Sequence, residues 1–128
     1  MKKDIKNRDD IYLLVKIFYE KLMNDDLMVH FFEDFENPEV LEKHLQILVD
    51  FWDTILFYSG AYKKNAMQPH IKLQVKKPFK KQHFQQWLMY FKNTVDSLYA
   101  GEIAHAAKSR ATSIATVMQI KISQLNEK

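Results

Sequence analysis

The sequence predicts an all-α domain, and three observations support this prediction. The 128 residues include only two Gly and three Pro, whereas a sandwich or barrel of short strands needs a Gly- or Pro-bearing turn roughly every 8–12 residues. Four stretches carry apolar residues at the spacing of one helix face, and no stretch alternates clearly as a strand does. We expect residues 1–128 to form one domain around one core.

The first two long helices are indicated by apolar spacing and by capping residues. Asn7 can cap the first helix, and the run Asn24-Asp25-Asp26 ends it. A short apolar piece, residues 27–32, follows. Asn37-Pro38-Glu39 opens the second helix, which we expect to end at Gly60. The two apolar faces are Ile11, Leu14, Val15, Phe18 and Leu22, and then Leu41, His44, Leu48, Phe51, Trp52 and Ile55.

Two further long helices are expected in the second half of the chain. A short helix over residues 67–74 precedes them, and Lys76-Lys77-Pro78 ends it. The third long helix runs from about Lys80 to Tyr99, and Gly101 separates it from the fourth, at about residues 102–125. Their apolar faces are Phe84, Trp87, Leu88, Phe91, Val95 and Leu98, and then Ile103, Ala107, Ala111, Ile114, Met118, Ile122 and Leu125.

Composition excludes several classes of function. The absence of Cys excludes disulfides, thiolate-bound metals and a cysteine nucleophile. The two widely separated Gly exclude a Gly-rich phosphate loop. A net charge of +3 is too balanced to indicate nucleic-acid binding. The sequence has no signal peptide and no apolar run of about 18 residues, so we expect a cytoplasmic protein that does not span a membrane.

Two histidines occupy unusual positions. His44 lies on the apolar face of the second helix, and His70 lies in the short helix after the intervening loop. That spacing lets the two imidazoles face each other across a slot, as a flat cofactor requires when one neutral imidazole binds its iron. His83 is a rival to His70. Taken singly, His44 is also compatible with a hydrogen-bonded core residue and His70 with a surface residue.

Tyr19 and Trp87 are candidate hydrogen-bond donors. Tyr19 lies beside the apolar face of the first helix, and Trp87 lies near the start of the face of the third. Both are compatible with core aromatics whose polar ends are satisfied. Alternatively, they converge on a ligand bound to iron, where neutral donors stabilise partial negative charge.

Several motifs, in this order and spacing, resemble the third group of the truncated haemoglobins over about residues 8–122. The resemblance implies a globin-like, two-over-two helical sandwich around haem b. It also implies that His70 is the proximal iron ligand and that Tyr19, His44 and Trp87 are distal polar residues. The apolar haem contacts that it implies are Phe18, Phe32, Leu48, Phe51, Trp52 and Leu73. The motifs are Ile17-Phe18-Tyr19-Glu20-Lys21, Glu42-Lys43-His44 with Phe51-Trp52, Pro69-His70-Ile71-Lys72-Leu73, and His83-Phe84-Gln85-Gln86-Trp87-Leu88.

The region from Gln74 to Lys77 is longer than the family pattern. Lys76, Lys77, Lys80 and Lys81 gather near it, and they are either solvated or include a partner for a haem propionate. The implied ligands are O2, NO and CO. Nitric-oxide dioxygenase or peroxidase-like turnover remains open and would need a separate reductase, because no flavin or nicotinamide signature is present. The alternative function is a cofactor-free helical interaction module with the same fold.

Overall fold

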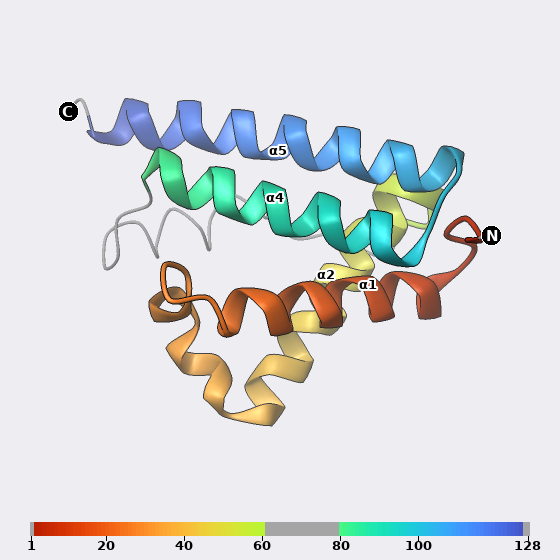
Figure 1. Ribbon diagram of the computed structural model, residues 1–128, viewed down its shortest axis with the longest axis horizontal. Helices are drawn as coiled ribbons and strands as arrows, with labels where there is room; N and C mark the ends of the chain where they lie inside the picture. The colour runs from red at the N-terminus through yellow and green to blue at the C-terminus, as the bar shows by residue number, and fades with distance from the viewer. Residues whose placement is uncertain (1, 61–79, 127–128) are drawn as a thin grey trace.

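The computed structural model describes residues 2–60 and 80–126 (Figure 1). Within these two ranges the chain forms helices and no strand, which confirms the all-α prediction. The expected short helix over 67–74, with His70 and Leu73, lies outside the described residues, as do Lys76 and Lys77. The elements are the α-helices α1 (Arg8–Met23), α2 (Pro38–Phe57), α4 (Lys81–Leu98) and α5 (Glu102–Asn126), and the 3-10 helix η1 (Val29–Glu36).

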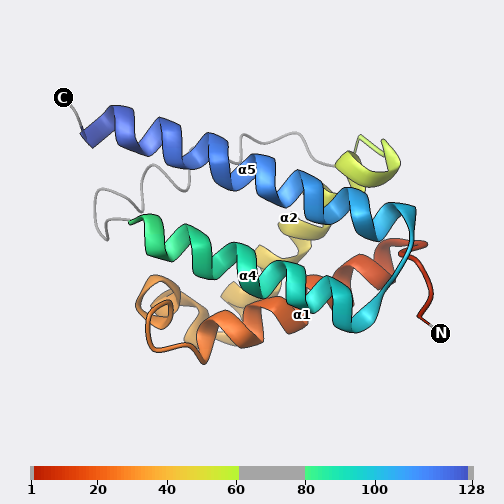
Figure 2. The ribbon, with the colours of Figure 1, turned by 45° about the horizontal axis from the view of Figure 1, so that its top comes forward.

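The long helices form two packed pairs. α4 and α5 run antiparallel and side by side, as Figures 1 and 2 both show, and α1 packs against α2. α1 also runs antiparallel to α4 and contacts it, so α1 and α4 join the pairs through one main core. This arrangement confirms the two-over-two sandwich. None of the helices in the described ranges has the length and hydrophobicity that a membrane crossing needs.

The predicted capping residues start α1 and α2. The side chain of Asn7 accepts a hydrogen bond from the backbone N–H of Asp10, and that of Asn37 accepts one from Glu39 N–H, both at 3.0 Å. The predicted end of α2 at Gly60 is wrong. The helix ends at Phe57, because the next residue takes the left-handed conformation (φ 58°) that terminates helices.

α2 is rotated from the predicted orientation. Its apolar side chains cover more than one face, so packing against α1 decides which face enters the core, and periodicity alone does not. The fully buried apolar residues of α2 are Leu45, Val49, Trp52 and Leu56. The predicted face therefore lies at the edge of the core, where Leu41, His44, Leu48, Phe51 and Ile55 are only partly buried.

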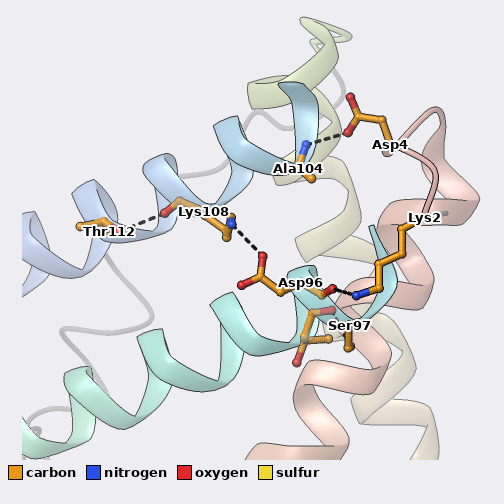
Figure 3. Close-up of polar contacts among 8 residues, drawn as sticks. Lys2, Asp4, Asp96, Ser97, Ala104, Lys108 and Thr112 are labelled. Carbon is orange, nitrogen blue, oxygen red and sulfur yellow. Dashed lines mark hydrogen bonds and ion pairs between the residues drawn. The ribbon is translucent and has the colours of Figure 1, made fainter. Parts of the chain in front are cut away.

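The N-terminal segment caps α5 (Figure 3). The carboxylate of Asp4 accepts hydrogen bonds from the backbone N–H groups of Ile103 and Ala104, at 2.9 and 2.8 Å. Gly101 passes so close to Asp4 that a Cβ at this position would lie 2.5 Å from the Asp4 Cγ. Its φ of 144° also disfavours any other residue. Gly101 therefore permits the contact that fixes the start of α5.

Candidate functional site

Tyr19 and His44, two of the predicted site residues, form a hydrogen-bonded pair. The Tyr19 hydroxyl on α1 lies 2.8 Å from Nε2 of His44 on α2, and the imidazole tautomer decides which group donates. Tyr19 is only 8% exposed. Burial raises the pKa of Tyr19 far above its ordinary value of 10.0, so the phenol stays neutral and keeps its proton for donation.

Aromatic rings of η1 hold this pair in place. Phe32 meets the Tyr19 ring edge-on at 5.4 Å between centroids, and Phe35 stacks on His44 at 4.7 Å. Phe35 was missed by the sequence analysis, because η1 extends beyond the expected piece at 27–32 and Phe35 stands among acidic residues. The sequence does hold a signal for Phe35: it lies three residues after Phe32, which is one turn of a 3-10 helix, so the two rings share a helix face.

Trp87 on α4 lies against a second set of rings. Its indole stacks on Phe91 with centroids 5.8 Å apart and meets Phe18 edge-on at 5.6 Å. Trp87 is partly buried, and no acceptor for its indole N–H is found within the described ranges. Phe18 also contacts the Tyr19 ring at 5.7 Å, so Phe18 connects Trp87 to the Tyr19–His44 pair.

The remaining predicted contacts divide between core and edge. Trp52 is buried and stacks on Phe91 at 4.9 Å. Phe51 is partly buried and meets Trp52 edge-on, and Leu48 is partly buried on the same helix. The predicted His70 and Leu73 lie outside the described residues, so their placement stays a prediction. Of the four lysines expected near the propionates, Lys80 and Lys81 are exposed and the other two are outside these ranges.

His83 is occupied by a structural role. Its ring is 6% exposed, and Nδ1 accepts the backbone N–H of Lys80 at 2.8 Å. Burial, together with the nearby charges of His30 and Lys80, lowers the pKa of His83. The ring is therefore neutral with its proton on Nε2, and as placed it offers no lone pair to a metal. This geometry disfavours His83 as the rival to His70.

The donor set fits a flat apolar cofactor that carries a polar ligand. A phenol, an imidazole and an indole N–H stand among large apolar side chains, which is the composition expected of such a pocket. Within the described residues no cluster of three or more His, Asp or Glu could hold a metal ion. Large apolar side chains that are partly buried at the edge of the core include Phe32, Leu48, Phe51, Trp87 and Leu88.

Comparisons with known proteins agree with this geometry. No protein-family model matches the sequence. The chain is similar to a group 3 truncated haemoglobin of Campylobacter jejuni, with 28% identity over 121 residues and 93% of each chain covered. Its structure is similar to the crystal structure of a group III truncated haemoglobin from the same organism, with a TM-score of 0.85, 27% identity and 95% of both chains covered.

Both similarities extend over almost the whole chain. They therefore include the helices that carry the Tyr19–His44 pair and Trp87 as well as the overall arrangement of elements. The ordered motifs, the two-over-two fold and the two matches agree that the chain is similar to the group III truncated haemoglobins in sequence and in fold.

Proposed function

We propose that the chain binds haem b and, through it, the diatomic gases O2, NO and CO. The observation that carries the proposal is the Tyr19–His44 pair, in which the hydroxyl of the buried Tyr19 lies 2.8 Å from Nε2 of the partly buried His44 and aromatic rings contact both residues. A bound ferrous haem would supply the iron that coordinates the gas. The imidazole of His70 would hold that iron, and apolar side chains of the chain would surround the haem.

The tautomer of His44 controls what Tyr19 can do. A tyrosine hydroxyl has one proton to donate. When Nε2 of His44 is unprotonated, that proton is directed to the imidazole. When Nε2 carries a proton, His44 donates to the Tyr19 oxygen, and the Tyr19 O–H is free to point at a ligand. His44 therefore orients the phenol.

Trp87 supplies a second neutral donor from the opposite pair of helices. Its ring is held by Phe91 and Phe18, so the indole N–H has a fixed direction. Neutral donors in an apolar pocket interact strongly with a polar ligand, because water is excluded and the local dielectric constant is low. Two such donors favour retention of a polar gas ligand over its rapid release.

Reconstitution with haem tests the proposal. The purified protein is titrated with haemin, and ferric and ferrous spectra are recorded with and without CO. We expect one haem per chain, a ferrous CO adduct, and loss of haem affinity in His70→Ala. His105→Ala is the matched control, because His105 is exposed on α5, and it should leave the spectra unchanged.

Two results would contradict the proposal in different ways. A folded protein that stays colourless when haem is supplied would favour the cofactor-free helical module. A His70→Ala variant with an unchanged ferrous spectrum and haem affinity would leave haem binding intact but overturn the axial assignment.

A further inference from the structure

Asp25 lies in the turn between α1 and η1, and its carboxylate accepts four hydrogen bonds. Oδ1 accepts from the backbone N–H groups of Leu27 and Met28, at 2.8 and 3.1 Å. Oδ2 accepts from Nε2 of Gln86 at 2.8 Å and from the hydroxyl of Tyr90 at 2.5 Å. One oxygen therefore shapes the turn, and the other binds α4.

Asp25 is ionised in this setting. The Tyr90 hydroxyl, followed by Gln86 and the two backbone donors, lowers the pKa of Asp25 below its ordinary value of 3.8, against the opposing effect of partial burial. Charge-assisted hydrogen bonds of this kind are stronger than neutral ones. The link between the turn and α4 is accordingly a strong one.

The two α4 donors stand next to Trp87 in the helix. Gln86 directly precedes Trp87, and Tyr90 follows Gln86 by about one turn. Two bonds one turn apart fix both the rotation of α4 and its position along its own axis. Any slip of α4 would carry the Trp87 ring away from Phe18, which belongs to α1.

The other polar ties from α4 to neighbouring elements lie farther from Trp87 in the described part of the chain. Lys21 on α1 donates to Oγ1 of Thr94 at 3.0 Å. Asp96, near the C-terminal end of α4, pairs with Lys108 of α5 at 2.7 Å, and its carbonyl accepts from Lys2 (Figure 3). Among the polar contacts of the described residues, those of Asp25 therefore register the Trp87 end of α4 against the turn that follows α1.

We infer that Asp25 is a positioning residue for Trp87: its carboxylate holds α4 so that the indole N–H keeps its direction relative to Tyr19. For gas binding, the inference rests on the function proposed above. For the placement of Trp87 it does not, because the contacts between Asp25, α4 and α1 involve the protein alone.

Asp25→Asn separates the two roles of the carboxylate. The Asn side-chain oxygen can still accept from the backbone N–H groups of the turn, whereas its NH2 group faces the donors of Gln86 and Tyr90 and cannot accept from them. Tyr90→Phe removes one α4 donor and leaves the turn untouched. Asp96→Asn is the matched control, because it alters a carboxylate contact of the same helix far from Trp87.

The first measurement needs no haem. The chain has two Trp, so 5-fluorotryptophan labelling gives two 19F NMR resonances, which Trp87→Phe assigns. We expect Asp25→Asn to shift or broaden the Trp87 resonance more than that of Trp52, which contacts α4 through Phe91. The effect should be smaller for Tyr90→Phe and absent for Asp96→Asn. An unchanged Trp87 resonance in both Asp25→Asn and Tyr90→Phe would overturn the inference.

The second measurement uses the haem-loaded protein. We expect Asp25→Asn to raise the O2 dissociation rate by about three- to tenfold, the effect of weakening one hydrogen bond. The same substitution made in Trp87→Phe should add nothing further, because the group that it positions is gone. Equal effects in both backgrounds would overturn the role in gas binding. Failure to bind haem would overturn the proposed function and leave the NMR result standing.

Discussion

Tyr19 shows how one buried side chain can depend on its partner. Its hydroxyl contacts His44, and under the proposed function a gas ligand is a second possible acceptor for its single proton, which burial keeps in place at ordinary pH. The rings of Phe32 and Phe18 limit the movement of the phenol. What Tyr19 can bind therefore depends on the direction of its hydrogen bond and not on a charge.

Tyr19→Phe should raise the O2 dissociation rate of the haem-loaded protein by about ten- to a hundredfold. The substitution removes a donor worth about 1.5–3 kcal/mol where the acceptor carries charge. Tyr12→Phe is the control, because Tyr12 also lies on α1 and donates to a residue of α2, Glu42, at 2.9 Å, but at an exposed position. Stopped-flow mixing with CO measures the rate. Equal rates in the two variants would exclude Tyr19 as a ligand donor.

His83 should make the stability of the fold depend on pH. Its pKa is lowered in the folded state from the ordinary value of 6.5, so below that pH the unfolded chain binds more protons than the folded one. The contribution of the neutral His83 ring to the free energy of unfolding is complete above pH 6.5. It is lost as the pH falls from 6.5 towards the pKa of His83 in the folded protein.

Urea unfolding between about pH 7 and pH 5 separates this effect from that of the carboxyl groups with lowered pKa values, which titrate below that range, and comparison with a His83 variant separates it from the other histidines. We expect His83→Gln to flatten the decline in unfolding free energy, since Gln can still accept the Lys80 N–H but does not titrate. A decline as steep as in the wild-type protein would mean that another group is responsible.

At the scale of the elements, the helix caps could be predicted from the sequence, whereas the packing of one helix against another could not. Asn7 and Asn37 cap their helices through residues two or three positions away, so the sequence alone contains the evidence. The rotation of α2 depends on which of its several apolar faces meets α1. Asp25 was interpreted only as part of a helix end, because Gln86 and Tyr90 lie 61 and 65 positions along the chain.

The candidate site follows the same division. Tyr19 and His44 could be found because each is a polar residue on or beside an apolar face, and the structure brings them into contact. Phe35 could not be predicted in this way, because it stacks on His44 only once η1 has folded back against α2. The placement of His70 stays a prediction.

The start of α5 offers a test of the N-terminal cap. Asp4→Ala should lower the free energy of unfolding by about 1–2 kcal/mol, because two backbone N–H groups lose their acceptor. Gly101→Ala should also destabilise the fold, since the new Cβ would meet the Asp4 side chain. Urea denaturation measures both changes.

The double variant supplies the control for this pair. With Asp4 replaced by Ala, the contacts of a new Cβ with the carboxylate are removed and only the one with the Cβ of residue 4, at 2.7 Å, remains. Gly101→Ala should therefore cost less than it does alone. Fully additive effects would show that Gly101 does not serve the Asp4 contact.

For the whole molecule, the two-over-two arrangement leaves several large apolar side chains only partly buried at the edge of the core, and the proposed function assigns them to the wall of the haem pocket. Large side chains of three elements contribute to it: Phe32 from η1, Phe51 from α2 and Trp87 from α4 are each only partly buried. Burial of the rest of this surface is favourable, at about 25 cal/mol per Å². A flat apolar cofactor that covers this wall should therefore stabilise the entire fold as well as add function.

Haem should accordingly raise the free energy of unfolding of the whole chain. A ligand that binds only the folded state contributes about 2.7 kcal/mol at a free concentration of a hundred times its dissociation constant. Urea unfolding with increasing haemin should show this concentration dependence in the wild-type protein and a weaker one in His70→Ala, with His105→Ala as the control. A midpoint that does not move with haemin would mean that the partly buried wall belongs to the fold alone, since a cofactor held by that wall cannot leave the unfolding equilibrium unchanged.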